Sequence, residues 1–457
     1  MDANKATIVV DLGFGDSGKG TIVDYLARGV RNPLVVRFNG GGQAAHNVRT
    51  TDGKHHTFAQ FGSGTFAGAR THLSRFMLID PESMEEEAAH LRDLGLGNVF
   101  AKLTVDEDAK VVTPFHKAAN RLRETLRGAH RHGTCGMGIG ETVSDDLNRP
   151  ERTIRARDLR NKEALAQKLA AVQEAKREEF KDVVGAIAPM TDPKILSHVA
   201  LLNDPRVPQG VAQRMWKAAM KFAVVPGNYL KKLARYHELI FEGAQGVLLD
   251  QWYGFHPHTT WSVTTFDNAL ALLHEIEFEG EVEKLGVLRA YMTRHGEGPF
   301  PTFDETLTRT LREKENGDDG WQGNFKSGWF DFVLARYAIA ACKGVDSLAI
   351  TCLDRVRTLP QVKWCDAYVV EGKEDWMHTL PIKPDLTDQD FQANLTSILS
   401  RVSDCVLSST YTDFVDRFDE ESFLQTIERN LGAPVRIVSD GPTAADKRVR
   451  EAARLAA

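Results

Sequence analysis

Residues 6–20 read ATIVVDLGFGDSGKG, an apolar run that leads directly into a glycine-rich loop. The next stretch, TIVDYLARGV at residues 21–30, has the apolar spacing of a helix. A strand, a glycine loop and a helix in this order are typical of phosphate-binding α/β proteins, because glycines let successive backbone N–H groups point at phosphate oxygens. This stretch therefore predicts a parallel-sheet α/β fold with a phosphate-binding loop at residues 13–20.

The loop nearly matches the pattern GxxxxGK followed by serine or threonine, with Lys19 as the lysine and Gly20 in the hydroxyl position. That hydroxyl normally helps to hold Mg²⁺, so another residue must do so if the loop binds a nucleoside triphosphate. Asp16 is the candidate, because a carboxylate facing phosphates is repelled unless a metal or a proton lies between them. The alternative is a tight glycine turn with an exposed lysine, which the strand and helix on either side disfavour.

Apolar runs that end in glycine or polar residues recur along the chain and predict further strands. They lie at residues 32–46, 101–106, 237–250, 284–292, 346–354, 366–370 and 433–442. Helical spacing occurs at residues 83–95, 115–130 and 158–182, and the charges of the last stretch are predicted to face solvent. We expect one large α/β domain over residues 1–457, with a mainly parallel central sheet flanked by helices and a helical insertion at roughly 83–235.

Composition excludes several classes of protein. The chain has 457 residues, and 57 basic against 63 acidic side chains give a net charge of −6, which argues against a general nucleic-acid binder. No run approaches the roughly 18 apolar residues of a membrane span. The five cysteines are scattered and form no CxxC pair. These features predict a cytoplasmic protein with reduced thiols that binds neither nucleic acid nor membrane.

Several motifs occur together in one order. VVDLGFGDSGKG (9–20) and VVRFNGGGQAAHNV (35–48) are followed by GTCGMGIG (133–140), FEGAQGVLLD (241–250), TRHGEGPFPT (293–302), SGWFD (327–331), TCLD (351–354) and SDGP (439–442). In combination they resemble the adenylosuccinate synthetase family, and the resemblance covers roughly residues 6–445. It implies a homodimeric, Mg²⁺-dependent ligase with GTP as co-substrate. Such an enzyme phosphorylates the 6-oxygen of IMP and lets the amine of aspartate displace the phosphate.

The resemblance also implies roles for individual residues. Asp16 matches the family's base and magnesium ligand, and the carbonyl of Ala45 matches a second magnesium ligand. The other implied catalytic residues are Lys19, His46, which contacts the transferred phosphate, and Gln245. The donor nucleotide is held by Gly15, Asp16, Ser17, Gly18, Lys19, Gly20, Asp354, Ser439, Gly441 and Pro442. The substrates are held by Gln43, Thr134, Gln245, Thr260, Lys326 and Arg149, the last reaching across a dimer interface.

The sequence departs from the family pattern at several of these positions. Ser17 replaces a loop glutamate, Gln43 an asparagine, Ala45 a glycine, and Cys352 a lysine that packs along guanine. A backbone ligand at Ala45 requires a negative φ.

The largest departure concerns the amino acid. The arginines that grip aspartate are missing from GWQGNFKSGW (320–329), where only Lys326 is cationic, and Met137 replaces one more. Glu141 and Glu297 stand where the family usually has uncharged residues. The alternative is that the arginines that grip aspartate come from elsewhere in the chain, for instance Arg294 or Arg149. We therefore expect aspartate to be a poor substrate, and a less acidic or cationic amine to be preferred.

Three other functions stay open at this point. A diverged paralogue would keep the chemistry but use another amine, another purine nucleotide or ATP. A non-catalytic nucleotide-binding protein would need neither Asp16 nor His46, and a plain NTPase would leave EGAQG and the two threonines unexplained.

Overall fold

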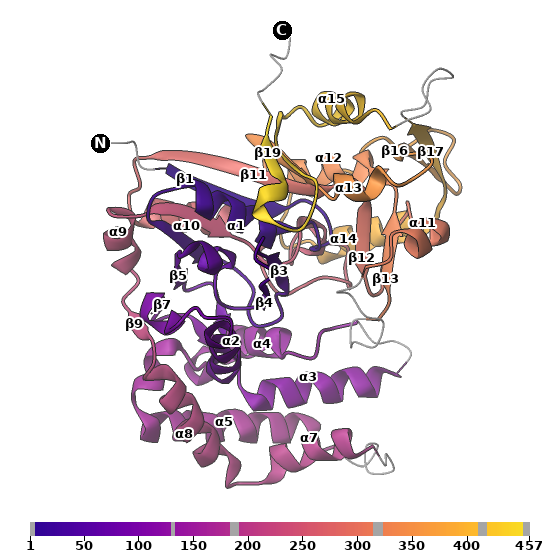
Figure 1. Cartoon of the computed structure of the whole chain (residues 1–457). Helices are drawn as coiled ribbons and strands as arrows, with labels where there is room; N and C mark the ends of the chain where they lie inside the picture. Colours follow the sequence, from indigo (N-terminus) through magenta and orange to yellow (C-terminus); the bar gives the residue numbers. More distant parts are fainter. Residues whose placement is uncertain (1–4, 129–132, 183–191, 314–322, 410–417, 451–457) are drawn as a thin grey trace.

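A ten-stranded sheet runs through the molecule, in the order β19-β18-β15-β11-β1-β10-β2-β5-β7-β9 (Figure 1). The computed structural model describes residues 5–128, 133–182, 192–313, 323–409 and 418–450. Neighbouring strands of this sheet are parallel except for β18 and β19. The strands are β1 (Lys5–Asp11), β2 (Pro33–Arg37), β5 (Arg70–Leu73), β7 (Leu103–Asp106), β9 (Ala223–Val225), β10 (Glu238–Glu242), β11 (Glu281–Arg289), β15 (Ser347–Thr351), β18 (Val435–Ser439) and β19 (Lys447–Val449). The predicted α/β class with a mainly parallel sheet is confirmed.

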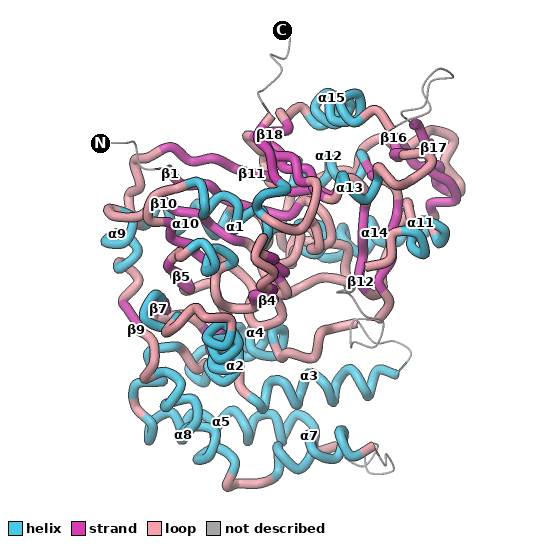
Figure 2. Tube along the Cα trace, viewed as in Figure 1, coloured by secondary structure: helices cyan, strands magenta, loops and turns pink. Residues whose placement is uncertain are grey.

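The helices surround this sheet and also form a separate group at one end (Figure 2). They are α1 (Lys19–Gly29), α2 (Pro81–Asp93), α3 (Pro114–Arg127), α4 (Ile139–Asn148), α5 (Lys162–Phe180), α7 (Pro193–Asn203), α8 (Val207–Ala219), α9 (Tyr229–Ala234), α10 (Asp267–Glu275), α11 (Glu305–Thr310), α12 (Phe332–Ala341), α13 (Leu353–Val356), α14 (Gln389–Ser400) and α15 (Glu420–Leu431). Helices α2, α3, α5, α7 and α8 gather beyond the β7–β9 end of the sheet (Figures 1 and 2). Within the described ranges, no helix has the length and apolar content needed to cross a membrane.

The span predicted as a helical insertion holds this helical group, but it also contributes β7 and β9 to the central sheet. Residues 129–130 of one predicted helix lie outside the described residues. Smaller sheets complete the fold: β3 (His46–Arg49) with β4 (His55–Phe58), β6 (Leu78–Ile79) with β8 (Lys110–Val111), β12 (Met292–His295) with β13 (Phe325–Gly328), and β14 (Phe330–Asp331) with β16 (Lys363–Val370) and β17 (Val402–Ser409). The strand predicted at 366–370 lies in the last of these.

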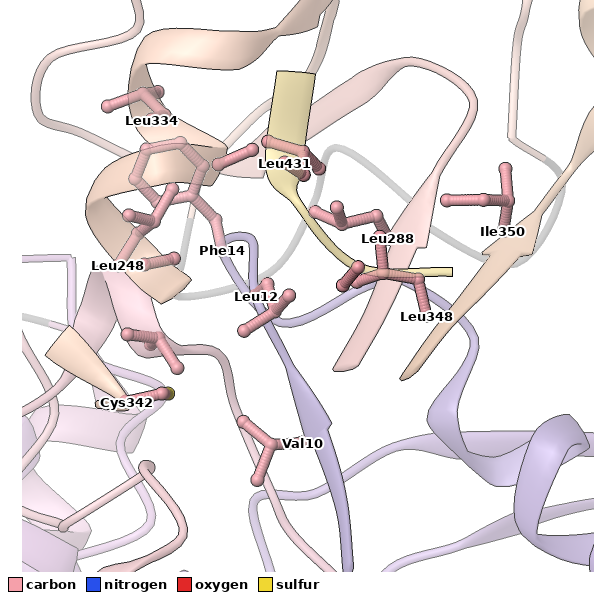
Figure 3. Packing of buried hydrophobic residues seen from close by; sticks show 14 of the residues in the cluster. Val10, Leu12, Phe14, Leu248, Leu288, Leu334, Cys342, Leu348, Ile350 and Leu431 are labelled. Carbon is pink, nitrogen blue, oxygen red and sulfur yellow. The ribbon is translucent and has the colours of Figure 1, made fainter. Parts of the chain in front are cut away.

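The core beneath the phosphate loop explains why β1 is apolar at three consecutive positions, Ile8, Val9 and Val10. Val10 and Leu12 belong to the cluster on one face of the sheet, and Phe14 continues that cluster into the loop (Figure 3). Val9, which alternates with Val10 along the strand, is buried in a second cluster that contains Ile22 of helix α1. A strand covered on both faces has no solvent side, so its side chains need not alternate between apolar and polar.

The parallel arrangement brings the functional loops to one edge of the sheet. Asp11, Glu242 and Arg289 end three adjacent strands, β1, β10 and β11. The loops that follow the carboxyl ends of parallel strands form the usual binding crevice of such sheets.

Candidate active site

A single carboxylate, that of Asp11, organises the phosphate loop. Its oxygens accept hydrogen bonds from the backbone N–H of Gly13 (2.8 Å) and of Ser17 (2.8 Å), and from the Ser17 hydroxyl (2.8 Å). The Lys19 ammonium donates to Asp11 Oδ2 at 2.9 Å and to the Gly15 carbonyl at 2.6 Å. Ser17 and Lys19 therefore point toward Asp11, and the loop owes its shape to residues of its own strand and helix.

Gly20 permits β3 to lie against helix α1. A Cβ atom at this position would be 2.7 Å from the Cβ of His46 and 3.0 Å from the Ser63 hydroxyl. A serine or threonine here would therefore push His46 away from the loop. The missing hydroxyl of the phosphate-loop pattern is explained by this close contact.

His46 is oriented by Glu242, the last residue of β10. Its Nδ1 lies 2.6 Å from Glu242 Oε1, and Glu242 also accepts from the backbone N–H of Ser63 at 2.9 Å and from the Ser63 hydroxyl. Burial lowers the pKa of His46 to about 4, although the hydrogen bond to Glu242 opposes this shift. Burial opposes ionisation of Glu242, but Arg37, His46 and Ser63 together lower its pKa to about 2. The imidazole is thus neutral at pH 7, with its proton on Nδ1 and its Nε2 turned away from Glu242.

Asp16 differs from Asp11 because no hydrogen bond or ion pair among the described residues uses its carboxylate. Burial raises the pKa of Asp16 above its usual value, and the positive charges of Arg289 and Lys19 counteract part of that rise. A carboxylate in such surroundings is available to a proton or to a cation.

One cavity of about 630 Å³ collects most of the predicted donor-site residues. It is lined by Gly15, Asp16, Gly18, Lys19, Gly20, Ala45, His46, Asp354, Ser439, Gly441 and Pro442. Ser17, which the resemblance also placed at the donor nucleotide, does not line it because its side chain is bonded to Asp11. The cavity thus runs from the phosphate loop to the segments predicted to hold the donor base.

Two glutamines lie on another side of the phosphate loop, close to Gly40 and Gly41. Gln245 has φ +57°, and its Oε1 would be 3.1 Å from a Cβ at Gly40, while Gln43 Oε1 would be 3.2 Å from a Cβ at Gly41. Both amide atoms of Gln43 and the Oε1 of Gln245 are buried without a hydrogen-bond partner among the described residues. Buried amides without partners are costly, so this pair indicates a polar ligand.

The remaining predicted substrate residues are more dispersed. The Thr134 hydroxyl accepts from Asn120 Nδ2 at 2.9 Å, and Thr260 donates its backbone N–H to Leu249 at 2.8 Å. Arg149 ends α4, is 41% exposed and lies 3.6 Å from Glu179. None of these three lines the 630 Å³ cavity.

Comparison with known proteins agrees with this geometry. The profile of the adenylosuccinate synthetase family matches residues 8–447. The chain belongs to the adenylosuccinate synthetase family. Adenylosuccinate synthetase of Chlorobium chlorochromatii is 30% identical over 96% of this chain and 95% of its own length, and that of Chlorobium limicola is 31% identical over 96% and 95%.

Two solved structures share the fold. Fully ligated adenylosuccinate synthetase from Plasmodium falciparum superposes with a TM-score of 0.77 at 20% identity, covering 97% of this chain and 99% of that one. Succinoaminodeoxyadenylate synthetase of cyanophage S-2L, bound to dGMP and to dATP as energy donor, has a TM-score of 0.59 at 17% identity, covering 98% and 95%.

Lys326 and Arg294, two of the cations considered above for the amine, both donate hydrogen bonds to backbone carbonyls. Lys326 on β13 donates from Nζ to the Gly296 carbonyl at 3.2 Å. Arg294 is buried, and its guanidinium donates to the carbonyls of Glu297 and Pro299. It therefore holds the loop at 297–299. Residues 320–322 of the arginine-poor stretch lie outside the described residues.

The two carboxylates that depart from the family pattern differ in their surroundings. Glu141 is bonded to Arg123 at 2.8 Å and to Lys176 at 3.0 Å, and Glu297 is exposed. Lys176 belongs to α5, whose charges were predicted to face solvent, yet its side chain is 1% exposed. That expectation was wrong for Lys176, because α4 covers this face of α5 with Glu141 and Asp145.

Sequence reasoning missed several residues of this site. Asp11, Glu242 and Arg289 each end a strand. Asp11 and Glu242 lie within the motifs quoted above, but neither was given a role from the sequence. Asp11 holds the loop that follows its own strand, whereas Glu242 and Arg289 act on residues of other elements. His295 is a fourth, since its Nε2 is buried without a partner among the described residues. The sequence signal that could have identified the three strand-end residues is a polar residue at the end of an apolar run.

Replacing Glu242 with glutamine is expected to lower kcat at least about tenfold, because the neutral amide no longer fixes the Nδ1 proton of His46. The KM for the donor nucleotide should change little. Steady-state kinetics of Glu242→Gln measure this, with Ser63→Ala as the control that removes one hydrogen bond to Glu242 but keeps the carboxylate. An unchanged kcat in Glu242→Gln would show that His46 needs no such partner.

Proposed function

We propose that this C–N ligase transfers the γ-phosphoryl group of GTP to the 6-oxygen of IMP or a related 6-oxopurine nucleotide, and that an amine then displaces the phosphate. The amine implied by the family is that of L-aspartate. The observation that carries the proposal is the presence of Asp16, His46 and Asp354 on one cavity with the phosphate loop.

The two steps need distinct groups. In the first, the purine N1 proton leaves as the 6-oxygen attacks the γ-phosphorus, and the unengaged Asp16 carboxylate accepts that proton. The bond between the γ-phosphorus and the β–γ bridging oxygen breaks, and GDP leaves. The negative charge of the transferred phosphoryl group favours protonation of His46 at Nε2, which then donates to a phosphate oxygen. In the second step the amine nitrogen attacks C6, the C6–O bond breaks, and phosphate leaves with the proton from His46. The amine nitrogen then loses one proton to solvent water.

Mg²⁺ fits this donor set. Asp16 offers a free carboxylate, and Ala45 lines the same cavity and is not among the residues with positive φ, as a carbonyl ligand at this position requires. Mg²⁺ needs only one or two ligands from the protein in such a site, because substrate phosphates and water would supply the others. Bound there, the ion would neutralise charge on the donor phosphates.

The alternatives explain less of the structure. A nucleotide-binding protein without activity does not require His46 to be oriented by a buried glutamate. An NTPase without a purine acceptor leaves the buried amides of Gln43 and Gln245 without a partner.

The decisive experiment is a phosphate-release assay with IMP, GTP and Mg²⁺, run with and without a panel of amines. The proposal predicts release that depends on both IMP and an amine. Release from GTP alone at the same rate would favour the NTPase, and no release with any amine would favour the binding protein.

GTP is expected to be used with a higher kcat/KM than ATP. Asp354 accepts from guanine N1–H and N2–H₂, whereas it would face the unprotonated N1 of adenine, and unpaired buried polar groups cost about 1–3 kcal/mol. Initial rates with each donor measure this preference, and Asp354→Asn is the matched variant that should reduce it. Equal kcat/KM values for GTP and ATP would show that Asp354 does not select the donor base.

A homodimer and a cytoplasmic location complete the proposal. Arg149 is exposed at the end of α4, as an arginine that reaches into a partner's substrate site must be. Sedimentation of the purified chain tests the dimer, and mixing Arg149→Leu with a second inactive variant tests whether activity returns in hybrid dimers.

A further inference from the structure

Arg289 is a second buried cation on the wall of the donor cavity, and neither its sequence context nor the implied mechanism uses it. It ends β11, next to β1 in the central sheet, and is 8% exposed. Lys19 and Arg289 both line the cavity beside Asp16.

Its guanidinium is fixed along one edge. Nε donates to the main-chain carbonyl of Asp16 at 2.5 Å, and Nη1 donates to Glu313 at 2.7 Å and to the Tyr291 hydroxyl at 2.9 Å. Tyr291 in turn donates to Glu313 at 2.8 Å. Among the described residues the hydrogen bonds of Arg289 use Nε and Nη1, so the two hydrogens of Nη2 are left for a ligand.

Lys19 is less available to an anion than its place in the phosphate-loop pattern suggests. Two of the three N–H bonds of its ammonium go to Asp11 and Gly15, and its side chain is 1% exposed. A nucleoside triphosphate brings several negative charges next to the unpaired carboxylate of Asp16. The anchored guanidinium beside the loop is the cation best placed to offset them, because its orientation is already fixed before the ligand binds.

We propose that Arg289 binds the phosphate chain of the donor nucleotide through Nη2, and that Glu313 and Tyr291 are positioning residues which hold it there. This inference rests on the proposed function, since it names a further residue of the same donor site. Arg289 then contributes charge to phosphoryl transfer from a place that no part of the glycine loop predicts.

The test is equilibrium binding of GTP, GDP and GMP to Arg289→Met, in the presence of Mg²⁺ and again in EDTA. Loss of one or two charge-assisted hydrogen bonds is expected to weaken GTP and GDP binding roughly 10- to 100-fold and GMP binding much less. Arg289→Lys keeps the positive charge but loses the planar guanidinium with its several N–H donors. Its affinity for GTP and GDP should lie between those of Arg289→Met and the wild type. Arg312→Met removes a positive charge from an exposed part of the same cavity, and it should lose clearly less affinity.

A second arm separates phosphate binding from simple neutralisation of Asp16. If Arg289 only shields that carboxylate, the double variant Asp16→Asn/Arg289→Met regains wild-type affinity for GDP in EDTA, and the inference is wrong. If Arg289 contacts phosphate, the affinity of the double variant for GDP stays below that of the wild type. Should Arg289→Met not fold, as a thermal melt would show, Arg289→Lys carries the same comparison.

The outcomes for the two proposals are distinct. A wild-type chain that binds neither GTP nor ATP would overturn the proposed function. A wild-type chain that binds GTP, together with an Arg289→Met variant that binds GTP and GDP equally well, would overturn only the role of Arg289.

Discussion

Replacing Asp16 with asparagine is expected to lower kcat by roughly 10²-fold or more, the usual cost of losing a general base. The asparagine amide cannot accept the N1 proton of the purine, and it is a poorer ligand for Mg²⁺ than a carboxylate. Phosphate release with saturating IMP, GTP and amine measures the effect. Near-normal turnover of Asp16→Asn would eliminate the mechanism proposed above.

The Asp16→Asn variant should still fold. The loop is held by Asp11, and the Asp16 carboxylate has no hydrogen-bond partner among the described residues. Because burial raises the pKa of Asp16, the ionised group costs stability at neutral pH, and asparagine should leave the melting temperature unchanged or higher. Asp11→Asn is the opposite control, expected to lower the melting temperature because the buried Lys19 ammonium loses its counter-ion.

The parts of this site that could be read from the sequence are those built from contiguous residues. The glycine loop, its lysine and Asp16 lie within eight positions between a strand and a helix, so local geometry alone brings them together. The fold class followed for the same reason, since each apolar run ending in glycine reports one buried parallel strand.

The residues that sequence reasoning missed act across strands. Glu242 orients His46 although 196 positions separate them, and Arg289 reaches the carbonyl of Asp16 across 273 positions. Such pairs depend on strand order, which no local pattern specifies. Lys176 shows the same limit for helices, because spacing along α5 does not reveal that α4 covers one of its polar faces.

L-aspartate is expected to be used poorly, with a KM well above the millimolar range. Each charge-assisted hydrogen bond to an arginine contributes about 1.5–3 kcal/mol, and each 1.4 kcal/mol is about tenfold in affinity, so losing two or three contacts costs several powers of ten. Arg294 cannot compensate because its guanidinium is bonded to the carbonyls of Glu297 and Pro299. Mass spectrometry of a reaction with IMP, GTP, Mg²⁺ and millimolar aspartate detects any succinylated nucleotide. Efficient formation at a sub-millimolar KM would contradict this prediction.

The structure also narrows which amine should be preferred instead. A cationic amine was expected partly because of Glu141 and Glu297, but the first is paired with Arg123 and Lys176 and the second faces solvent. Amines that carry fewer carboxylates than aspartate are therefore expected to react better than both aspartate and cationic amines. Asn324 is exposed directly before β13, and its carbonyl accepts from the Gly296 N–H at 3.1 Å, so it lies beside the carbonyl that Lys326 contacts. Asn324→Arg and Lys326→Arg should each lower the KM for aspartate roughly tenfold, since a guanidinium binds a carboxylate through two parallel hydrogen bonds and an ammonium does not. Lys326→Gln is the matched control and should raise that KM. If all three variants leave the KM for aspartate unchanged, the start of β13 does not contact the amine.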